Sequence, residues 1–268
     1  MLKDITLGQF FPGNTIVHRL DPRTKILAVI LYIVALFSAG SVLTYVLAAA
    51  VLALCILVSK VPFKSLTKGL KPILIIVIFT AVMNLFFTKG TAICDVWLLR
   101  HITWEGLAAA AKMMVRIVML IMGTFLLTYT TSPISLTDGL ESLLGFLKKI
   151  KVPVHELSMM MSIALRFIPT LIEETDKIMS AQKARGADFE SGNIFQRAKA
   201  LVPILVPLFI SAFRRADELA TAMECRCYHG GEGRTALHVL HYKTADWLTL
   251  AGFVALAAGV IVLGKFGL

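Results

Sequence analysis

The chain has 268 residues, of which 57% are hydrophobic, and its mean hydropathy is +0.78. A water-soluble domain has about 45–50% apolar residues, so this composition excludes an ordinary soluble protein and predicts an integral membrane protein. The formal net charge of +10 needs no nucleic acid to explain it, because the short cytoplasmic loops of membrane proteins gather Lys and Arg.

Uncharged apolar blocks recur along the chain, and with their flanks they approach the roughly 17–25 residues that cross a bilayer as a helix. No cleavage site follows the first block, so we expect it to be retained as a span. We predict an all-α polytopic membrane protein with about five transmembrane helices. The predicted spans are approximately 24–40, 42–59, 71–88, 105–130 and 244–264.

The distribution of Lys and Arg predicts the orientation of these spans. Basic residues gather before the first span, between the second and third spans, and between the fourth and fifth spans. The opposite loops and the C-terminal end hold only Lys89, Arg100 and Lys265. Because cytoplasmic loops carry the excess of basic residues, we expect the N-terminus inside the cell and the C-terminus outside.

Two cations, Lys112 and Arg116, lie within the predicted fourth span. Their i, i+4 spacing places them on one face of a helix. A charged side chain at the bilayer centre costs about 2.5–3.5 kcal/mol on insertion scales, so this face should turn inward or reach the interface. Two explanations stay open: the cations anchor a tilted helix at the interface, or they line a substrate path.

The segment 131–245 differs in kind from the spans. Pro133 is predicted to open a helix, and apolar positions recur at helical spacing from Val154 to Arg185. A second long helix is predicted over Ile194–Glu224, whose apolar stretch we judge too short to cross a membrane. The predicted domains are an N-terminal membrane domain with about four spans, a cytoplasmic domain of long amphipathic helices, and a C-terminal transmembrane helix, at 1–130, 131–245 and 246–268.

The ends of these two helices carry a repeat. "DKIMSAQKARG" (Asp176–Gly186) and "DELATAMECRC" (Asp217–Cys227) align without gaps, with Arg185 and Arg226 in register. Gly186 can stop the first helix, and Gly230–Gly231, just beyond the second copy, can stop the second helix. An arginine in the last turn complements the helix dipole and can offer a fork of donors to a carboxylate. Either each arginine only caps its own helix, or both dock onto a partner with two equivalent sockets, such as a dimer.

Over nearly its full length the chain resembles the transmembrane T component of energy-coupling factor (ECF) transporters, the EcfT family. "FPGNTIVHRLDPRTK" (Phe11–Lys25) is similar to the N-terminal signature of the family, and "TTSP" (Thr130–Pro133) to its next landmark. "ALRFIPTLIEE" (Ala164–Glu174) is similar to the segment before the first arginine motif, and "QKARGADF" (Gln182–Phe189) is close to that motif. The second motif departs from the usual Ala-Arg-Gly or Ala-Arg-Cys, because the chain has Cys225-Arg226-Cys227.

The resemblance implies an energy-coupling subunit of an ECF-type ABC importer in a bacterial or archaeal cell membrane. Its partners would be two related cytoplasmic ATP-binding subunits and a small substrate-binding membrane subunit for a vitamin or micronutrient. The long amphipathic helices of 131–245 would be coupling helices, with Arg185 and Arg226 as the contacts in the ATPase grooves. Close approach would be allowed by the flanking Ala184, Gly186, Cys225 and Cys227.

Several chemistries are not expected of this chain. It has no G-x-x-x-x-G-K-[ST] sequence, so ATP would be hydrolysed by partner subunits and the chain would bind no cofactor and would not be an enzyme. Cys225, Cys227 and His229 lack the usual zinc spacing, and we expect no metal site. One alternative function stays open, a dedicated nickel or cobalt transporter permease subunit that serves a single capture protein.

Overall fold

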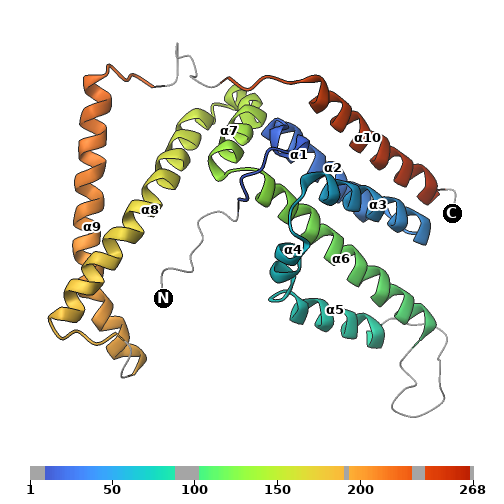
Figure 1. Ribbon diagram of the computed structural model, residues 1–268, viewed down its shortest axis with the longest axis horizontal. Coiled ribbons are helices and arrows are strands. Elements are labelled where there is room, and N and C mark those ends of the chain that lie inside the picture. Colours follow the sequence, from blue (N-terminus) through green and yellow to red (C-terminus); the bar gives the residue numbers. More distant parts are fainter. Residues whose placement is uncertain (1–9, 88–102, 190–192, 231–238, 266–268) are drawn as a thin grey trace. The chain divides into compact units, whose positions relative to one another are not determined.

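The computed structural model describes residues 10–87, 103–189, 193–230 and 239–265 (Figure 1). Its elements there are helices, which confirms the predicted all-α fold class. Two compact units are present, one formed by residues 8–139 with 240–268 and the other by residues 140–239. The elements are α1 Ile16–Arg19, α2 Pro22–Ser38, α3 Val42–Ser59, α4 Phe63–Leu70, α5 Leu74–Phe87, α6 Trp104–Thr130, α7 Pro133–Leu144, η2 Gly145–Ile150, α8 Val154–Ala184, α9 Ile194–Cys225 and α10 Thr244–Lys265.

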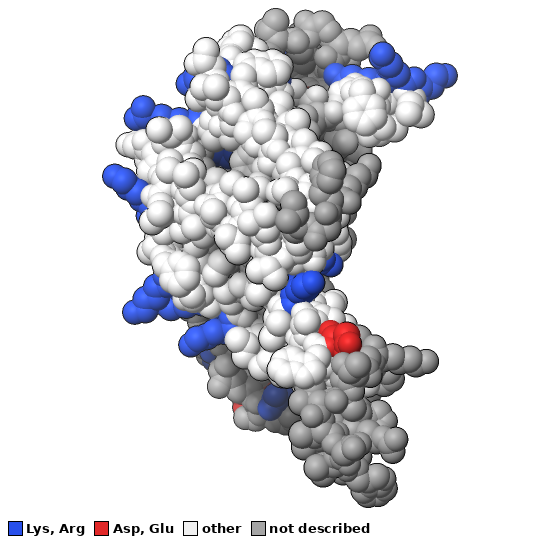
Figure 2. Space-filling view, turned by 90° about the vertical axis from the view of Figure 1, so that its right-hand side faces the viewer, with Lys and Arg blue, Asp and Glu red and all other residues white. Residues whose placement is uncertain are grey.

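Among the described helices, α3, α6, α9 and α10 are long and apolar enough to cross a membrane, and the bent pair α4–α5 adds a fifth span if it is counted as one. Figure 2 shows a broad face with few charged side chains, as a lipid-facing surface requires. The expectation that the apolar part of α9 is too short to cross a membrane is not confirmed. Phe195–Cys225 is long and apolar enough to cross, although its mean hydropathy of 1.3 is the lowest of the four helices. The apolar stretch Leu201–Phe213 is long enough to offset the charges beside it. α2, with 17 residues, lies at the short end of the range for a membrane span.

The core of the first unit lies where α2, α3, α6 and α10 pack together. Small residues such as Ala35 and Ala48, both fully buried, let the helix backbones approach closely, as is common between membrane helices. The larger side chains around them fill the space between the helices. The buried members of this core are Tyr32, Ala35, Leu36, Ala39, Tyr45, Ala48, Leu52, Met119, Leu256, Ala257 and Val260.

The two cations of α6 have a role that neither sequence-based explanation included. The ammonium of Lys112 donates to the carbonyl of Gly40 at 2.9 Å, and the guanidinium of Arg116 donates to the carbonyl of Ala39 at 3.0 Å. Arg116 also donates to the hydroxyl of Tyr45 at 2.9 Å. The last carbonyls of a helix have no partner within the helix. Lys112 and Arg116 therefore cap the end of α2 and the turn into α3.

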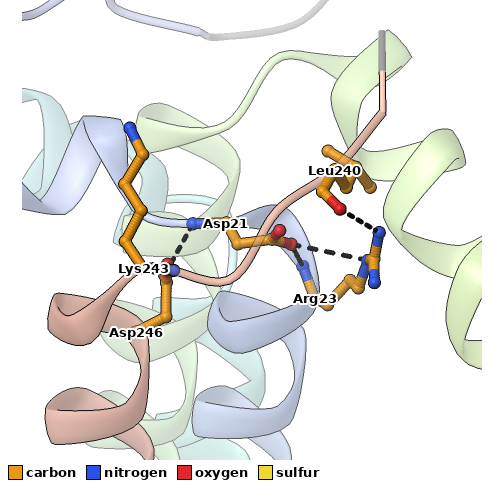
Figure 3. A network of polar contacts seen from close by, with 5 residues as sticks. All are labelled: Asp21, Arg23, Leu240, Lys243 and Asp246. Atoms are coloured by element: carbon orange, nitrogen blue, oxygen red, sulfur yellow. Dashed lines mark hydrogen bonds and ion pairs between the residues drawn. The ribbon is translucent and has the colours of Figure 1, made fainter.

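The start of α2 and the start of α10 share one buried carboxylate, that of Asp246 (Figure 3). Its Oδ1 accepts from the backbone N–H of Asp21, and its Oδ2 accepts from the backbone N–H of Lys243, both at 2.8 Å. Asp21 in turn accepts from the backbone N–H of Arg23 at 2.9 Å, and Arg23 donates to the carbonyl of Leu240 at 3.1 Å. Asp246 therefore caps two helices that are far apart in the sequence.

The N-terminal segment is tied to the end of α6. The backbone N–H of Phe11 donates to the carbonyl of Tyr129 at 3.0 Å, and the ring of His18 donates to the carbonyl of Phe11 at 3.1 Å. The ammonium of Lys25 donates to the carbonyl of Thr130 at 2.9 Å. Burial, and then the charge of Lys25, lower the pKa of His18, which favours the neutral ring at pH 7. One end of this unit therefore gathers the start of α2, the end of α6 and the start of α10.

Candidate functional site

The first arginine of the repeat caps the end of α8. Arg185 is the C-cap residue, and Gly186 follows it with a φ of +85°, a conformation that glycine adopts without strain. The backbone N–H of Gly186 donates to the carbonyl of Lys183, and the N–H of Ala187 donates to the carbonyl of Gln182, both at 3.0 Å. This pair of bonds is a Schellman motif. It satisfies the last carbonyls of the helix and fixes the position of the arginine backbone.

The second arginine caps the end of α9 in the same way. The residue after Arg226, Cys227, has a φ of 53°, and its N–H donates to the carbonyl of Glu224 at 2.8 Å. The N–H of Tyr228 donates to the carbonyl of Met223 at 3.1 Å. The bonds therefore match those of α8 at equivalent positions of the repeat. What the sequence shows as a repeat of residues is also a repeat of hydrogen bonds.

The left-handed position at the end of the second copy is not taken by a glycine. The second helix was predicted to end at Glu224, with Gly230 and Gly231 just beyond it as residues able to stop a helix; α9 ends at Cys225, and Cys227 takes the left-handed position that Gly186 takes in the first copy. A left-handed conformation costs a residue other than glycine about 1–2 kcal/mol. Gly230 also has a positive φ, 98°, but it lies beyond the helix, and Gly231 lies outside the described residues.

Both arginines are exposed, and within the described part of the chain neither guanidinium has a hydrogen-bond or ion-pair partner. The guanidinium of each arginine therefore does not bond the last carbonyls of its own helix, which the Schellman bonds already satisfy. Both guanidinium groups are therefore free of bonds to the described part of their own chain. Their neighbours in the motifs are also exposed, and Cys225 and Cys227 are free thiols; these neighbours are Ala184, Gly186, Cys225 and Cys227.

Metal binding at the second motif finds no support in the geometry. Among the residues that the structure describes, no group of three or more His, Cys, Asp or Glu side chains could hold a metal ion. Cys225, Cys227 and His229 are all described, and they do not form such a group. The described side chains at this helix end are an exposed arginine flanked by two free thiols.

Helices α8 and α9 pack against each other in opposite directions through a polar contact. The guanidinium of Arg215 donates to Glu174 Oε2 at 2.9 Å, and the hydroxyl of Ser211 donates to Glu174 Oε1. The same guanidinium lies 5.8 Å from the centre of the Phe167 ring. The hydrogen bond from Ser211, and then the charge of Arg215, hold the pKa of Glu174 below its ordinary value. The contact therefore pins the two helices where they cross.

The crossing contact occupies equivalent positions in the two helices. Glu174 and Arg215 each stand eleven residues before the arginine that caps their helix. Equivalent residues that touch each other lie beside a local two-fold axis, as in a symmetric dimer. At 1.5 Å per residue each arginine lies about 16 Å from this contact along its own helix, on opposite sides of it. In Figure 1 the C-terminal ends of α8 and α9 point away from the crossing in this manner.

The crossing contact was missed from the sequence. The repeat in the sequence begins at Asp176 and Asp217. Before them, Glu174 aligns with Arg215, and two residues of opposite charge count as a mismatch in an alignment. Those opposite charges are what allows the two copies to pair with each other. Extending the alignment backwards, and scoring complementary charges as a match, would have found Glu174 and Arg215.

We expect the Glu174–Arg215 pair to show a measurable coupling that depends on pH. Glu174→Ala, Arg215→Ala and the double substitution form a cycle whose coupling should be about 0.5–1 kcal/mol, because both side chains are partly exposed. Since the pKa of folded Glu174 lies below its ordinary value of 4.5, the coupling should be present above that value and lost as the pH falls through the lowered pKa. Thermal unfolding in detergent over a series of pH values from 7 downwards measures it, and a coupling that does not fall with the pH would contradict the assignment.

The helical fold, its apolar spans and this pair of arginine-capped helices define a polytopic membrane protein. The sequence profile of the family described as cobalt transport protein, CbiQ, matches residues 13–237. Several relatives are called energy-coupling factor transporter transmembrane protein EcfT. The one from Clostridium kluyveri is 58% identical to this chain over 92% of each chain. The one from Bacillus subtilis is 49% identical over 96% of this chain and 97% of its own. A relative of the same name in Acidaminococcus fermentans is 56% identical over 98% of this chain and 97% of its own.

The chain therefore belongs to the EcfT family of transmembrane components of energy-coupling factor transporters. It is a multi-pass membrane protein and a component of a transporter complex that has other subunits. The relatives are named as transporter components and not as enzymes.

Proposed function

We propose that the chain is the subunit that transmits the motion of two related cytoplasmic ATPases to a small substrate-binding membrane subunit, for the uptake of a vitamin or micronutrient. The observation that carries this proposal is the identical hydrogen-bonded cap at the ends of α8 and α9, with an exposed arginine in each. We call these two arginine-bearing helix ends the tips. Two equivalent tips, related by a local two-fold axis, suit a pair of equivalent grooves on two related subunits.

The chemistry of docking follows from the residues at each tip. A guanidinium offers a planar fork of donors that binds a carboxylate with two parallel hydrogen bonds, and such a bond gains strength when a groove excludes water. The small side chain of Ala184 and the absence of one in Gly186 let a groove wall approach the backbone of the first tip. At the second tip Cys225 and Cys227 are larger but still narrow. The Schellman bonds hold each arginine in place before docking, which lowers the entropy lost on binding.

The crossing contact explains how movement at the tips reaches the rest of the helix pair. If the two ATPases approach each other when they bind ATP, the tips move with them and the angle between α8 and α9 changes. Glu174 and Arg215 hold the helices together at the crossing, so they act as a pivot. Each arm from this pivot to its arginine is about 16 Å long, which converts a small change of angle into a shift of several ångströms. ATP itself is bound and hydrolysed by the partners.

Exposed apolar side chains on α8 and on α9 suit the substrate-binding membrane subunit. On α9, Phe209, Ile210 and Phe213 are 56–65% exposed, and on α8, Met160 and Met161 are 53–55% exposed. Methionine side chains adapt to surfaces of different shape. The exposed methionines of α8 can therefore adapt to more than one capture subunit, which favours a shared module over the dedicated nickel or cobalt permease.

The orientation we propose places the N-terminus in the cytoplasm of a bacterial or archaeal cell. Supporting this, the end of the first unit that holds the start of α2 and the end of α6 also carries Arg19, Arg23 and Lys25, and α4 with its lysines packs on the same end of α6. A cytoplasmic position is expected for the end that is rich in Lys and Arg.

Co-purification tests the proposed function. The tagged chain, extracted from its native membrane with a mild detergent, should bring two related ATPases and one or more small hydrophobic proteins, identified by mass spectrometry. Several different capture proteins would indicate a shared module, and a single one would indicate the dedicated nickel or cobalt alternative. A chain that purifies alone, under conditions that keep other transporter complexes whole, would contradict the proposal.

A further inference from the structure

A short amphipathic helix, α4, carries and adjoins lysines that are not part of the proposed docking site. Lys64 and Lys68 are one helical turn apart on α4, Lys60 follows the last residue of α3, and Lys71 is the C-cap of α4. We call these four residues the lysine stripe. All are exposed, and no acidic residue lies between Lys60 and Lys71. Within the described residues none of their ammonium groups has an ion-pair or hydrogen-bond partner.

The opposite side of α4 is fixed to the core, which holds the lysines outward. Leu66 is fully buried in a cluster with Val61, Leu126 and Tyr129, the last two from the end of α6. The hydroxyl of Tyr129 also donates to the carbonyl of Ser65 at 3.2 Å. A basic face on a helix whose other face is anchored cannot turn away from its surroundings. Whatever lies next to α4 must therefore accommodate a row of positive charges.

The position of the lysine stripe places it at the level of lipid headgroups. It begins directly after α3, an apolar helix with a hydropathy of 2.6, and ends three residues before α5 begins. α4 and α5 are bent by 61° relative to each other, as expected where the chain turns from the membrane surface into the hydrocarbon. Next to Lys64, the side chain of Phe63 is 60% exposed. Interfacial helices combine such an apolar side chain with a lysine-rich polar face.

We propose that the lysine stripe binds the phosphate groups of anionic phospholipids and so fixes α4 in the headgroup layer. Charge complementarity selects the ligand, because the stripe is uniformly positive and lies between two apolar helices that border lipid. Each Lys near an anionic membrane surface contributes an attraction that corresponds to about a fivefold change in binding. The inference does not depend on the ATPase docking proposal, since it concerns a different unit of the chain and a different ligand.

Native mass spectrometry of the full-length chain with its co-purified subunits tests the inference. Phosphatidylglycerol and phosphatidylcholine with the same acyl chains are titrated separately, and the dissociation constant of each is measured. Wild type should prefer phosphatidylglycerol. Lys64→Gln with Lys68→Gln should weaken phosphatidylglycerol binding by about 5- to 25-fold and leave phosphatidylcholine binding unchanged, and added salt should reduce the preference. Lys64→Arg with Lys68→Arg should retain the preference, because the charge is kept.

A matched variant removes the same charge elsewhere. Lys177 and Lys199, on α8 and α9, are also exposed, and their replacement by Gln should leave the lipid preference intact. Equal weakening in this control would show that only the net charge matters and would overturn the site. An unchanged preference after all four stripe lysines are replaced would also overturn it. If that variant loses its ATPases while it keeps its lipid preference, the stripe is a protein interface and the lipid assignment is wrong.

Discussion

Replacing both Arg185 and Arg226 by alanine is expected to abolish substrate uptake while the membrane fold stays intact. Both side chains are exposed and contribute no bond to the described part of the chain, so their loss should not lower the thermal stability of the isolated chain. Truncating one partner of a buried, hydrogen-bonded charge pair costs about 2–5 kcal/mol, which weakens each docking contact by about 30-fold or more. Uptake in whole cells and recovery of the ATPases on affinity purification measure the effect.

Two matched variants separate geometry from charge at the tips. Lys183→Ala with Glu224→Ala alters equivalent exposed positions in the same last turns and leaves the net charge unchanged, so uptake should stay near the wild-type level. Arg185→Lys with Arg226→Lys keeps the charge but removes the fork that binds a carboxylate through two bonds, so it should rescue poorly. Wild-type uptake by the double alanine variant would refute docking through the arginines, and full rescue by lysine would show that only charge matters.

Replacing Asp246 by alanine is expected to destabilise the first unit strongly. Its carboxylate is 1% exposed and accepts the backbone N–H groups of Asp21 and Lys243, which begin α2 and α10. A hydrogen bond to a charged group contributes about 1.5–3 kcal/mol, so losing both should cost roughly 3 kcal/mol or more. For a chain of this size that corresponds to a fall in the unfolding midpoint of roughly 6–12 °C.

The same site provides its own control. Lys243 contributes only its backbone N–H to the Asp246 carboxylate, and its side chain is exposed, so Lys243→Ala should leave the unfolding midpoint nearly unchanged. Asp246→Asn keeps one acceptor oxygen and should lose about half as much stability as alanine. Thermal unfolding of the purified chain in detergent measures all three variants. A midpoint for Asp246→Ala equal to that of wild type would mean that the carboxylate does not hold the two helices together.

The long helices of the chain were predictable because their signals are local. Periodicity placed the first long helix of the segment 131–245 at Val154–Arg185, against Val154–Ala184 in the structure, and the second at Ile194–Glu224, against Ile194–Cys225. Apolar runs identified the membrane class, and the aligned arginines identified the two helix ends. These features depend on residues within one helix, so the sequence of that helix is sufficient to predict them.

Contacts between distant segments were not predictable in the same way. Asp246 caps α2 only because α10 returns to lie beside it, and no spacing in the sequence indicates that return. Lys112 and Arg116 were predicted to anchor a tilted helix at the interface or to line a substrate path; their capping of α2 was not predicted, because it depends on α6 packing against the end of α2. Cys227 replaces the expected glycine at the end of α9, because hydrogen bonds within the motif can hold a residue other than glycine at a positive φ.

Site-directed photo-crosslinking tests the central claim, that each arginine tip docks into its own ATPase. A photoreactive amino acid is placed at Lys183 in one variant and at Glu224 in another, beside the two arginines and at equivalent positions. In the assembled complex, each variant should crosslink to an ATP-binding subunit, the two variants to different copies, and Arg→Ala at the same tip should abolish the crosslink. Crosslinks from both positions to a single copy, to the substrate-binding subunit, or only to lipid would contradict the account.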